Sequence, residues 1–400
     1  MGEWREATVA ELGTIFDGPH ATPTRRSSGA YFLNISSLKN GRLDLSESDH
    51  VSDEDFQKWT RRVTPTAGDL LFSYETRLGE AALMPAGVKA CLGRRMALLR
   101  PDRSRFDPRF LLYLYLGPAF QEMIAERSIH GATVSRIPLA SMPEWPVFVP
   151  DLQEQCAIAD VLGALDDKIA ANNTILDTIR ELLVSKFEQL GIDSSGEADE
   201  RSGTVADLMY INPRETVNPA EEAPFLEMKN LPDAAMTVSD WAYRAPKGGA
   251  KFRNGDTLLA RITPCLENGK VGYVDFLNVG EVGVGSTEFI VMRPRDGVPK
   301  ALPWLLSKSP KFREYAIKHM AGTSGRQRLS ARDIGPYPVT IPSSAQMESF
   351  SKLSDHLLKV IHGRVVENRS LAHTRDELLP LLMSGAITVK TAAQIVEKVN

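Results

Sequence analysis

The chain has 400 residues, 42% of them hydrophobic and 24% charged, and carries a formal net charge of −4 at pH 7. This length predicts two or three domains, each large enough for a core of its own. The slightly negative charge excludes a uniformly basic nucleic-acid coat and leaves local basic patches open.

Cysteine usage and hydropathy indicate the compartment. Cys91, Cys156 and Cys265 lie far apart and in no metal or redox spacing, as expected in a reducing cytosol. The sequence shows no signal peptide and no apolar run of about 18 residues, the length that spans a bilayer. We therefore expect a cytoplasmic protein.

Residues 1–150 are predicted to form a first mixed α/β domain. Their patterning predicts a hairpin within 32–45, a short helix over 51–62, buried strands at 70–72 and 96–100, and an amphipathic helix over 108–127. Polar residues follow the strands, where a rigid scaffold often displays binding groups. The side chains predicted to contact DNA phosphates or base edges are Ser73, Tyr74, Arg77, Arg94, Arg95, Thr133 and Arg136.

The stretch 151–190 predicts one long helix. Its apolar residues recur with a period of about 3.5, typical of a helix that packs along a partner helix. Pro150 precedes it and Gly191 follows it, and at 1.5 Å per residue it is roughly 60 Å long. Asn172 places an amide in the seam, which fixes register at some cost in stability. Its predicted coiled-coil interface residues are Ile158, Leu162, Leu165, Ile169, Asn172, Leu176, Ile179 and Leu183.

After an acidic, Ser/Gly-rich linker at 191–203, residues 204–342 predict a second mixed α/β domain. Its strand ends and loops are again rich in Arg, Lys, Asn, Gln, Ser and Thr. The predicted DNA contacts of this domain are Lys229, Arg261, Thr263, Asn268, Lys270, Arg326, Gln327 and Arg328.

Residues 343–384 predict a second long helix, the partner of the first, and a C-terminal tail occupies 385–400. Polar residues again stand near the middle of its seam. An ordinary helical hairpin, or two unrelated amphipathic helices, is the alternative interpretation. The predicted interface residues of the second helix are Leu353, Leu357, Val360, Arg364, Glu367, Leu371 and Leu378.

The chain is a tandem repeat. Val9-Ala10-Glu11-Leu12 returns as Val205-Ala206-Asp207-Leu208, and Gly68-Asp69-Leu70-Leu71 returns as Gly255-Asp256-Thr257-Leu258-Leu259. Five such anchors keep their order at an offset of 187 to 196 residues, while the residues between them differ widely. We therefore predict an α+β fold in which two pseudo-repeated α/β domains are joined by two long antiparallel coiled-coil helices.

Sequence signatures of catalysis are absent. There is no Asn/Asp-Pro-Pro-aromatic tetrad of an amino-methyltransferase, and Gly283-Val284-Gly285 lacks the third glycine of a dinucleotide site. Asp151 and Asp166-Asp167-Lys168 have a spacing seen in metal-dependent nucleases. Those acidic residues fall on the predicted long helix, off its seam, so we expect them to be solvated. No catalytic residue and no metal ligand is predicted.

With these motifs in place, the sequence resembles the DNA-specificity subunits of type I restriction–modification systems. The resemblance extends over essentially the whole chain and is carried by Gly68–Glu80, Cys91–Met96, Gly255–Lys270, Gly285–Phe289 and Pro150–Gln155. It implies two target-recognition domains, each recognising one half of a split DNA site, and antiparallel helices that set the distance between the halves.

The resemblance also implies partners. Two methyltransferase subunits would dock around the helices and use S-adenosylmethionine to methylate adenine, and ATP-dependent motor–nuclease subunits would join them. The present chain would bind no cofactor and catalyse no reaction. Its second helix start, Pro342-Ser343-Ser344-Ala345-Gln346, departs from the family pattern, so the two starts are not expected to bind a partner equally. The alternatives are a stand-alone DNA methyltransferase or nuclease, and a coiled-coil adaptor that never touches DNA.

Overall fold

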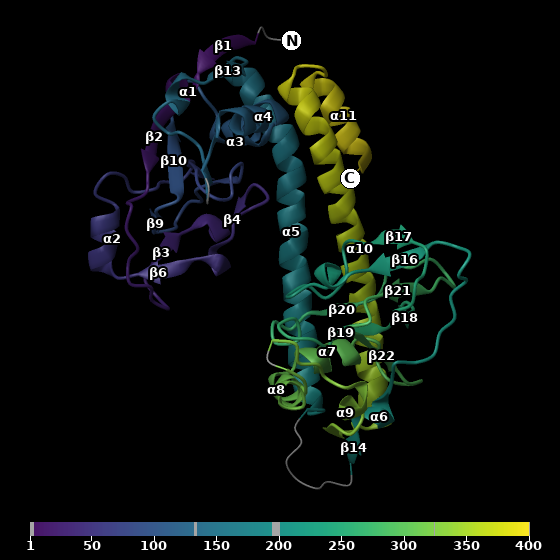
Figure 1. Cartoon of the computed structure of the whole chain (residues 1–400). Coiled ribbons are helices and arrows are strands. Elements are labelled where there is room, and N and C mark those ends of the chain that lie inside the picture. The colour runs from purple at the N-terminus through teal and green to yellow at the C-terminus, as the bar shows by residue number, and fades with distance from the viewer. Residues whose placement is uncertain (1–3, 132–133, 194–200, 324, 400) are drawn as a thin grey trace. The chain divides into compact units, whose positions relative to one another are not determined.

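The computed structural model describes residues 4–131, 134–193, 201–323 and 325–399. The chain divides into two compact units, Met1–Ile169 with Ser370–Asn400, and Ala170–Arg369. Each unit holds one α/β domain and a segment of each of two long helices, α5 (Leu152–Leu190) and α10 (Ser344–Met383) (Figure 1). The unit boundaries therefore pass through the helices, whereas the sequence suggested divisions at their ends.

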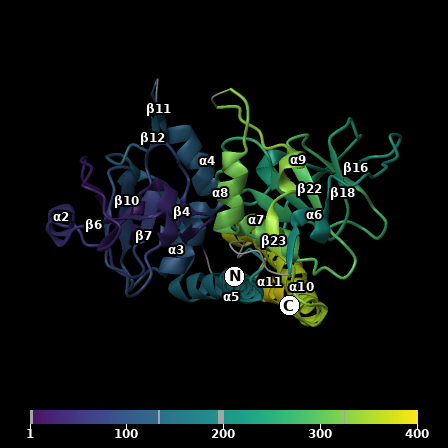
Figure 2. The same ribbon diagram turned by 90° about the horizontal axis from the view of Figure 1, so that it is seen from below.

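The first unit contains a four-stranded antiparallel sheet in the order β2-β10-β7-β8 and a smaller sheet in the order β6-β3-β9, in which β3 and β9 are parallel. Helix α3 packs against β8 and against β7, beside which it lies in Figure 2. The strands are β1 (Arg5–Thr8), β2 (Gly13–Asp17), β3 (Ala30–Leu33), β4 (Leu38–Lys39), β5 (Arg42–Leu43), β6 (Asp49–Val51), β7 (Leu70–Ser73), β8 (Ala81–Leu83), β9 (Ala90–Leu92), β10 (Met96–Pro101), β11 (Ile129–His130), β12 (Ser135–Arg136) and β13 (Pro146–Val149). The helices are α1 (Val9–Leu12), α2 (Asp53–Trp59), α3 (Pro108–Leu116), α4 (Pro118–Arg127) and the 3₁₀ turns η1 (Ile35–Ser37), η2 (Leu45–Glu47) and η3 (Met142–Glu144).

The second unit repeats this arrangement. Its antiparallel sheet has the order β15-β22-β19-β20, and its second sheet, β17-β16-β21-β18, again contains one parallel pair, β16 with β21. The strands are β14 (Ser202–Thr204), β15 (Met209–Ile211), β16 (Ala223–Leu226), β17 (Ala242–Arg244), β18 (Ala250–Phe252), β19 (Thr257–Ala260), β20 (Val271–Tyr273), β21 (Gly283–Gly285), β22 (Phe289–Pro294) and β23 (Pro338–Thr340). The helices are α6 (Val205–Leu208), α7 (Leu302–Lys308), α8 (Pro310–Lys318), α9 (Ala331–Ile334) and the turn η4 (Met228–Asn230).

A buried ion pair explains why the Gly-Asp anchor recurs. Asp69 is 1% exposed, and its carboxylate accepts hydrogen bonds from Arg100 Nε at 3.0 Å and Nη2 at 2.7 Å and from the Thr66 amide at 2.8 Å. Gly68, directly before it, has a φ of 83°, a conformation that favours glycine. The pair ties the start of β7 to the end of β10.

The second domain contains the same pair. Asp256 is fully buried and accepts hydrogen bonds from Arg293 Nε and Nη2, both at 2.7 Å, and from the Arg253 amide at 2.7 Å. These bonds to Asp256 raise the pKa of the Arg293 guanidinium. Gly255 has a φ of 91°. Conservation of a bidentate, desolvated pair between copies that otherwise differ indicates that it sets the strand register.

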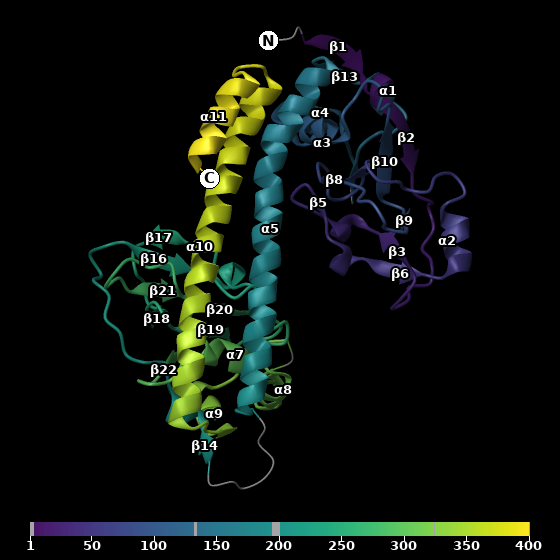
Figure 3. The same cartoon turned by 180° about the vertical axis from the view of Figure 1, so that it is seen from behind.

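The two long helices run side by side in opposite directions within each unit (Figures 1 and 3). In the first unit Ile158, Leu162 and Leu165 of α5 share a core with Leu371 and Leu378 of α10. The helix pair predicted from the heptads is therefore present, and α10 is not an unrelated helix.

A polar layer interrupts the seam in the second unit. Asn172 is 1% exposed, and its Nδ2 donates to Glu367 Oε2 at 2.9 Å and to Asn368 Oδ1 at 2.8 Å. Arg364 Nη1 donates to the same Glu367 oxygen at 2.6 Å. Because these donors and acceptors meet in only one register, the layer fixes how the two helices are paired.

On α10 the buried stripe differs from the predicted seam. Leu358 and Ile361 are buried, while the predicted Leu353, Leu357 and Val360 are only half-buried. The reason is that α10 packs against both α5 and the second α/β domain, whose residues form one cluster with it. A helix covered from two sides buries a wider stripe than a strict coiled-coil seam.

Three other expectations need correction. The helix predicted over 108–127 is broken into α3 and α4, because the residue before Pro118 is held in an extended conformation. The C-terminal tail contains a helix, α11 (Val389–Val399), whose Ala392 and Val396 are buried in the first core.

The third correction concerns Asp166, which was expected to be solvated. Its side chain is 18% exposed and accepts from Tyr113 Oη at 2.6 Å and from Arg375 Nη1 at 2.8 Å. It therefore joins α3 of the first domain to both long helices within the first unit. Among the described residues, no helix combines the length and hydropathy needed to cross a lipid bilayer.

The buried pair predicts a large asymmetry between two carboxylate substitutions. Asp69→Ala leaves the Thr66 amide and Arg100 Nε without their acceptor, which should cost about 2 kcal/mol of unfolding free energy. Glu54→Ala removes the exposed pair with Lys58 and should leave the unfolding midpoint unchanged. Urea denaturation of the full chain measures both, and equal shifts for the two variants would contradict this role for Asp69.

Candidate nucleic-acid interface

Three polar segments predicted to bind DNA come together in the first domain. Because Ser73 at the end of β7 pairs with Met96 at the start of β10, the loops beyond these strands are neighbours. The Tyr74 amide donates to the Arg95 carbonyl at 3.1 Å, and the Ile137 amide donates to the Tyr74 carbonyl at 2.8 Å. We call residues 73–77, 93–96 and 135–137 the first junction.

The second domain builds the same junction from other residues. The Arg261 amide donates to the Glu288 carbonyl at 3.0 Å, and the Leu329 amide donates to the Arg261 carbonyl at 2.8 Å. Residues 260–263, 286–289 and 327–329 form this second junction. The two junctions therefore share a backbone hydrogen-bond pattern and carry different side chains.

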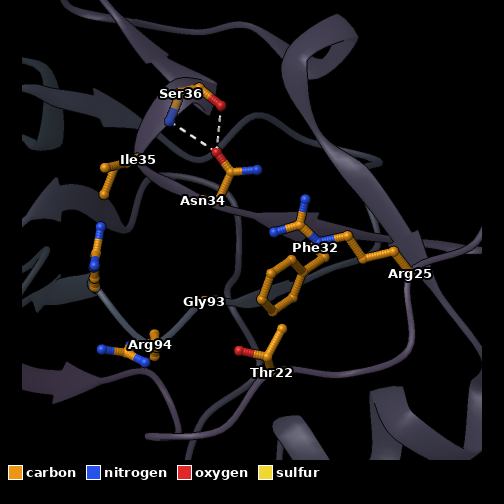
Figure 4. Close-up of a pocket in the computed structure, with 9 residues that line it drawn as sticks. Thr22, Arg25, Phe32, Asn34, Ile35, Ser36, Gly93 and Arg94 are labelled. Atoms are coloured by element: carbon orange, nitrogen blue, oxygen red, sulfur yellow. Dashed lines mark hydrogen bonds between the residues drawn. The ribbon is translucent and has the colours of Figure 1, made fainter.

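A cavity of about 380 Å³ adjoins the first junction, at the carboxyl ends of the parallel strands β3 and β9. Figure 4 shows Arg94, Thr22, Phe32 and Asn34 arranged around it. Arg25 and Arg95 also line it, and none of its lining residues is acidic. The cavity therefore offers hydrogen-bond donors and positive charge beside an aromatic ring.

The corresponding cavity of the second domain, about 520 Å³, lies at the carboxyl ends of β16 and β21. It is lined by Glu227, where the first cavity has Asn34, and by Arg244 and Thr287. Glu227 forms ion pairs with Lys229 at 2.8 Å and Arg244 at 2.7 Å. Hydrogen bonds from these two cations lower the pKa of the Glu227 carboxyl, and the bond from Lys229 has the larger effect.

Most of the residues predicted to contact DNA lie at the surface, and their side chains differ in how far they are exposed. Exposed side chains belong to Arg77, Arg94, Arg136, Lys229, Asn268, Arg326 and Arg328, and half-exposed ones to Arg95, Arg261, Thr263 and Gln327. Thr133 lies outside the described residues.

Three predicted contacts are instead part of the scaffold. Ser73 is fully buried and its Oγ donates to the Glu75 carbonyl at 2.9 Å. Tyr74 is 4% exposed, its hydroxyl donates to the Arg94 carbonyl at 2.7 Å, and burial raises the pKa of Tyr74 to about 12. Lys270 Nζ points inward and donates to the Leu231 carbonyl at 2.9 Å. These residues stabilise the loops and do not display groups to a ligand.

Ion pairing separates the junction arginines. Arg328 pairs with Glu288 at 2.8 Å, and its hydrogen bonds to that carboxylate raise the Arg328 pKa. Arg95 lies 3.8 Å from Glu75. Within the described parts of the chain, Arg94 and Arg136 have no carboxylate at ion-pair distance, so their charge faces solvent without compensation.

Sequence reasoning missed Arg25, Asn34 and Arg244, which line the cavities. For Asn34 the signal was present, because Phe32-Leu33 of the first copy returns as Phe225-Leu226 in the second, and these pairs directly precede Asn34 and Glu227. In the ranges that the structure describes, no three His, Cys, Asp or Glu side chains are grouped so as to hold a metal ion.

Comparisons with known proteins point in one direction. Residues 1–181 match the family model described as the type I restriction modification DNA specificity domain. The putative type I restriction enzyme MjaX specificity subunit of Methanocaldococcus jannaschii is 21% identical over an alignment that covers 95% of this chain and 92% of that protein. The type I restriction enzyme EcoEI specificity subunit of Escherichia coli is 32% identical, over 38% of this chain and 27% of its own length.

A solved structure shares the fold. The S subunit of a type-I restriction-modification system from M. genitalium superposes with a TM-score of 0.60 at 16% identity, over 95% of this chain and 96% of that one. The alignment with the archaeal relative spans both copies of the repeat and both long helices. The first 181 residues therefore carry the DNA specificity domain of type I restriction–modification systems, and nearly the whole chain is similar in sequence to a type I specificity subunit.

Proposed function

We propose that the chain reads a bipartite DNA site, with one α/β domain on each half-site, and directs partner subunits to that site. The observation that carries this proposal is the pair of junctions, which share a backbone frame and differ in their side chains. Two readers built on one frame suit two different half-sites, because phosphate contacts position a protein and base contacts specify the sequence.

The helix pair would act as the spacer between the two readers. Its register is fixed by the Asn172 layer in the second unit. The first domain is fastened to the helices by Asp166, through Tyr113 and Arg375. An α/β domain attached to the helices by buried polar contacts would be held at a defined distance from the other domain, and this distance would fix the gap between the two DNA half-sites.

The proposed partners are two methyltransferase subunits and, in a restricting complex, ATP-dependent motor–nuclease subunits, acting in the cytoplasm. S-adenosylmethionine would be bound by the methyltransferase subunits and not by this chain. The outer surface of α5 supports a docked partner, since Ile175 and Leu182, one heptad apart, are each 39% exposed. Large apolar residues exposed in a row on one helix face mark an interaction surface.

A domain exchange tests the two-reader proposal. Residues 1–150 are replaced by the matching domain of a relative that keeps a tyrosine at the position of Tyr113, so that the contact with Asp166 survives. The reconstituted methyltransferase complex is then expected to methylate a motif changed in one half only. Methylome sequencing of a host expressing the complex reads the motif, and a change in both halves would contradict the assignment of one domain to each half.

A heptad insertion tests the spacer. Seven residues are added to α5 and to α10 at facing positions, which keeps every apolar residue on its seam. The helices lengthen by roughly 10 Å at 1.5 Å per residue. With a rise of about 3.4 Å per base pair, the gap in the methylated motif should grow by about three base pairs.

The added gap also rotates one half-site about the duplex axis, so activity will fall unless the DNA twists or the domains re-aim. A four-residue insertion is the control and should be worse, because it moves the apolar residues off the seam. An active seven-residue variant with an unchanged gap would mean that the helices do not set the distance.

A further inference from the structure

The turn that follows the parallel strand is equivalent in the two domains. In the first, the Gly93 amide donates to the Leu33 carbonyl at 2.7 Å, and the Met96 amide donates to the Gly93 carbonyl at 3.0 Å. In the second, the Ser286 amide donates to the Leu226 carbonyl at 3.1 Å, and the Phe289 amide donates to the Ser286 carbonyl at 3.1 Å. The two central residues of one turn therefore correspond, one to one, to those of the other.

The chemistry at these central positions is replaced completely. Arg94 corresponds to Thr287, and Arg95 corresponds to Glu288. A contact to phosphate would serve both half-sites alike, since every nucleotide carries the same phosphate. A position that is cationic in one copy and neutral in the other therefore suits a group that differs between the half-sites, which is a base edge.

At a second pair of equivalent positions, the residue is the same in both domains. Arg136 forms an antiparallel bridge with Glu75, and Arg328 forms the same bridge with Ile262. These two arginines thus occupy the same place in the two junctions, and both are exposed. Retention of an arginine at one place in both frames suits the sequence-independent part of the interface.

The surroundings of Arg94 fit a base edge. Arg94 lines the cavity of about 380 Å³ together with Phe32 and Asn34, and no acidic residue lines it (Figure 4). Its main chain is held in place, because the Arg94 carbonyl accepts the Tyr74 hydroxyl at 2.7 Å. A guanidinium on a fixed turn can present two parallel donors, which match the N7 and O6 acceptors of guanine in the major groove.

We propose that Arg94 is a specificity-determining residue that reads a guanine in the half-site of the first domain, whereas Arg136 and Arg328 contact phosphates in their respective half-sites. The assignment rests on the proposed DNA-reading function. It separates Arg94, which has a different residue at the equivalent position of the other copy, from Arg136 and Arg328, which correspond.

The test compares Arg94→Ala with Arg136→Ala in the full chain, assembled with its methyltransferase subunits. Both side chains are exposed and belong to the same domain, so each variant is the control for the other. The selected site is read by methylome sequencing, and affinity for the selected site and for random DNA is measured between low and high salt.

Arg94→Ala should relax one base pair in one half of the motif, with discrimination at that position falling on the order of ten-fold. Arg136→Ala should keep the motif, weaken specific and random DNA alike, and flatten the plot of log affinity against log salt by about one. Arg328→Ala should also keep the motif, with a smaller change of the salt slope, because Arg328 is already paired with Glu288.

An unchanged motif in Arg94→Ala, with affinity lowered equally for all sequences, would overturn the assignment and make Arg94 a phosphate contact. A motif relaxed by Arg136→Ala would overturn it as well. Failure of the proposed function itself is distinguishable, because the wild-type complex would then select no site.

Discussion

Two buried carboxylate–arginine pairs set the geometry on which recognition depends. Asp69 with Arg100, and Asp256 with Arg293, tie together two antiparallel strands at the end opposite to the polar loops. A strand slipped by one residue would turn every side chain to the other face of the sheet. By fixing register at one end, each pair determines which loop residues meet at the other end, only four or five residues away.

The loops at that other end combine a constant frame with variable contents. Their backbone hydrogen bonds repeat from copy to copy, and their charges do not. In the first junction Arg95 lies near Glu75, whereas in the second Glu288 pairs with Arg328. At the turn centres the recognition surface can therefore diverge at little cost to the core, because Arg94 and its counterpart Thr287 are both exposed.

The sequence predicted the architecture well and the roles of single side chains less well. The repeat and the heptads could be recognised in the sequence because both are periodic. A periodic pattern is visible from the class of residue at each position, without knowledge of which surfaces meet in the fold. The break at Pro118 and the helix over 389–399 were also readable, from a proline and from apolar residues at helical spacing. The burial of Tyr74 and the shift of the α10 stripe to Leu358 and Ile361 were not, since each depends on which surface covers the residue in three dimensions.

The core of the first unit is completed by the last part of the chain. Leu371, Leu378, Leu382, Ala392 and Val396 all belong to the cluster that begins with Ala7 and Val9. On the ribosome, the first domain and the start of α5 are synthesised long before these residues emerge, so their apolar face has no intramolecular cover during that interval. Contacts of such long sequence separation form late and slowly. The nascent chain therefore exposes this face until residues 371–396 have been synthesised, and a chain that stops before Leu371 has no such residues with which to cover it.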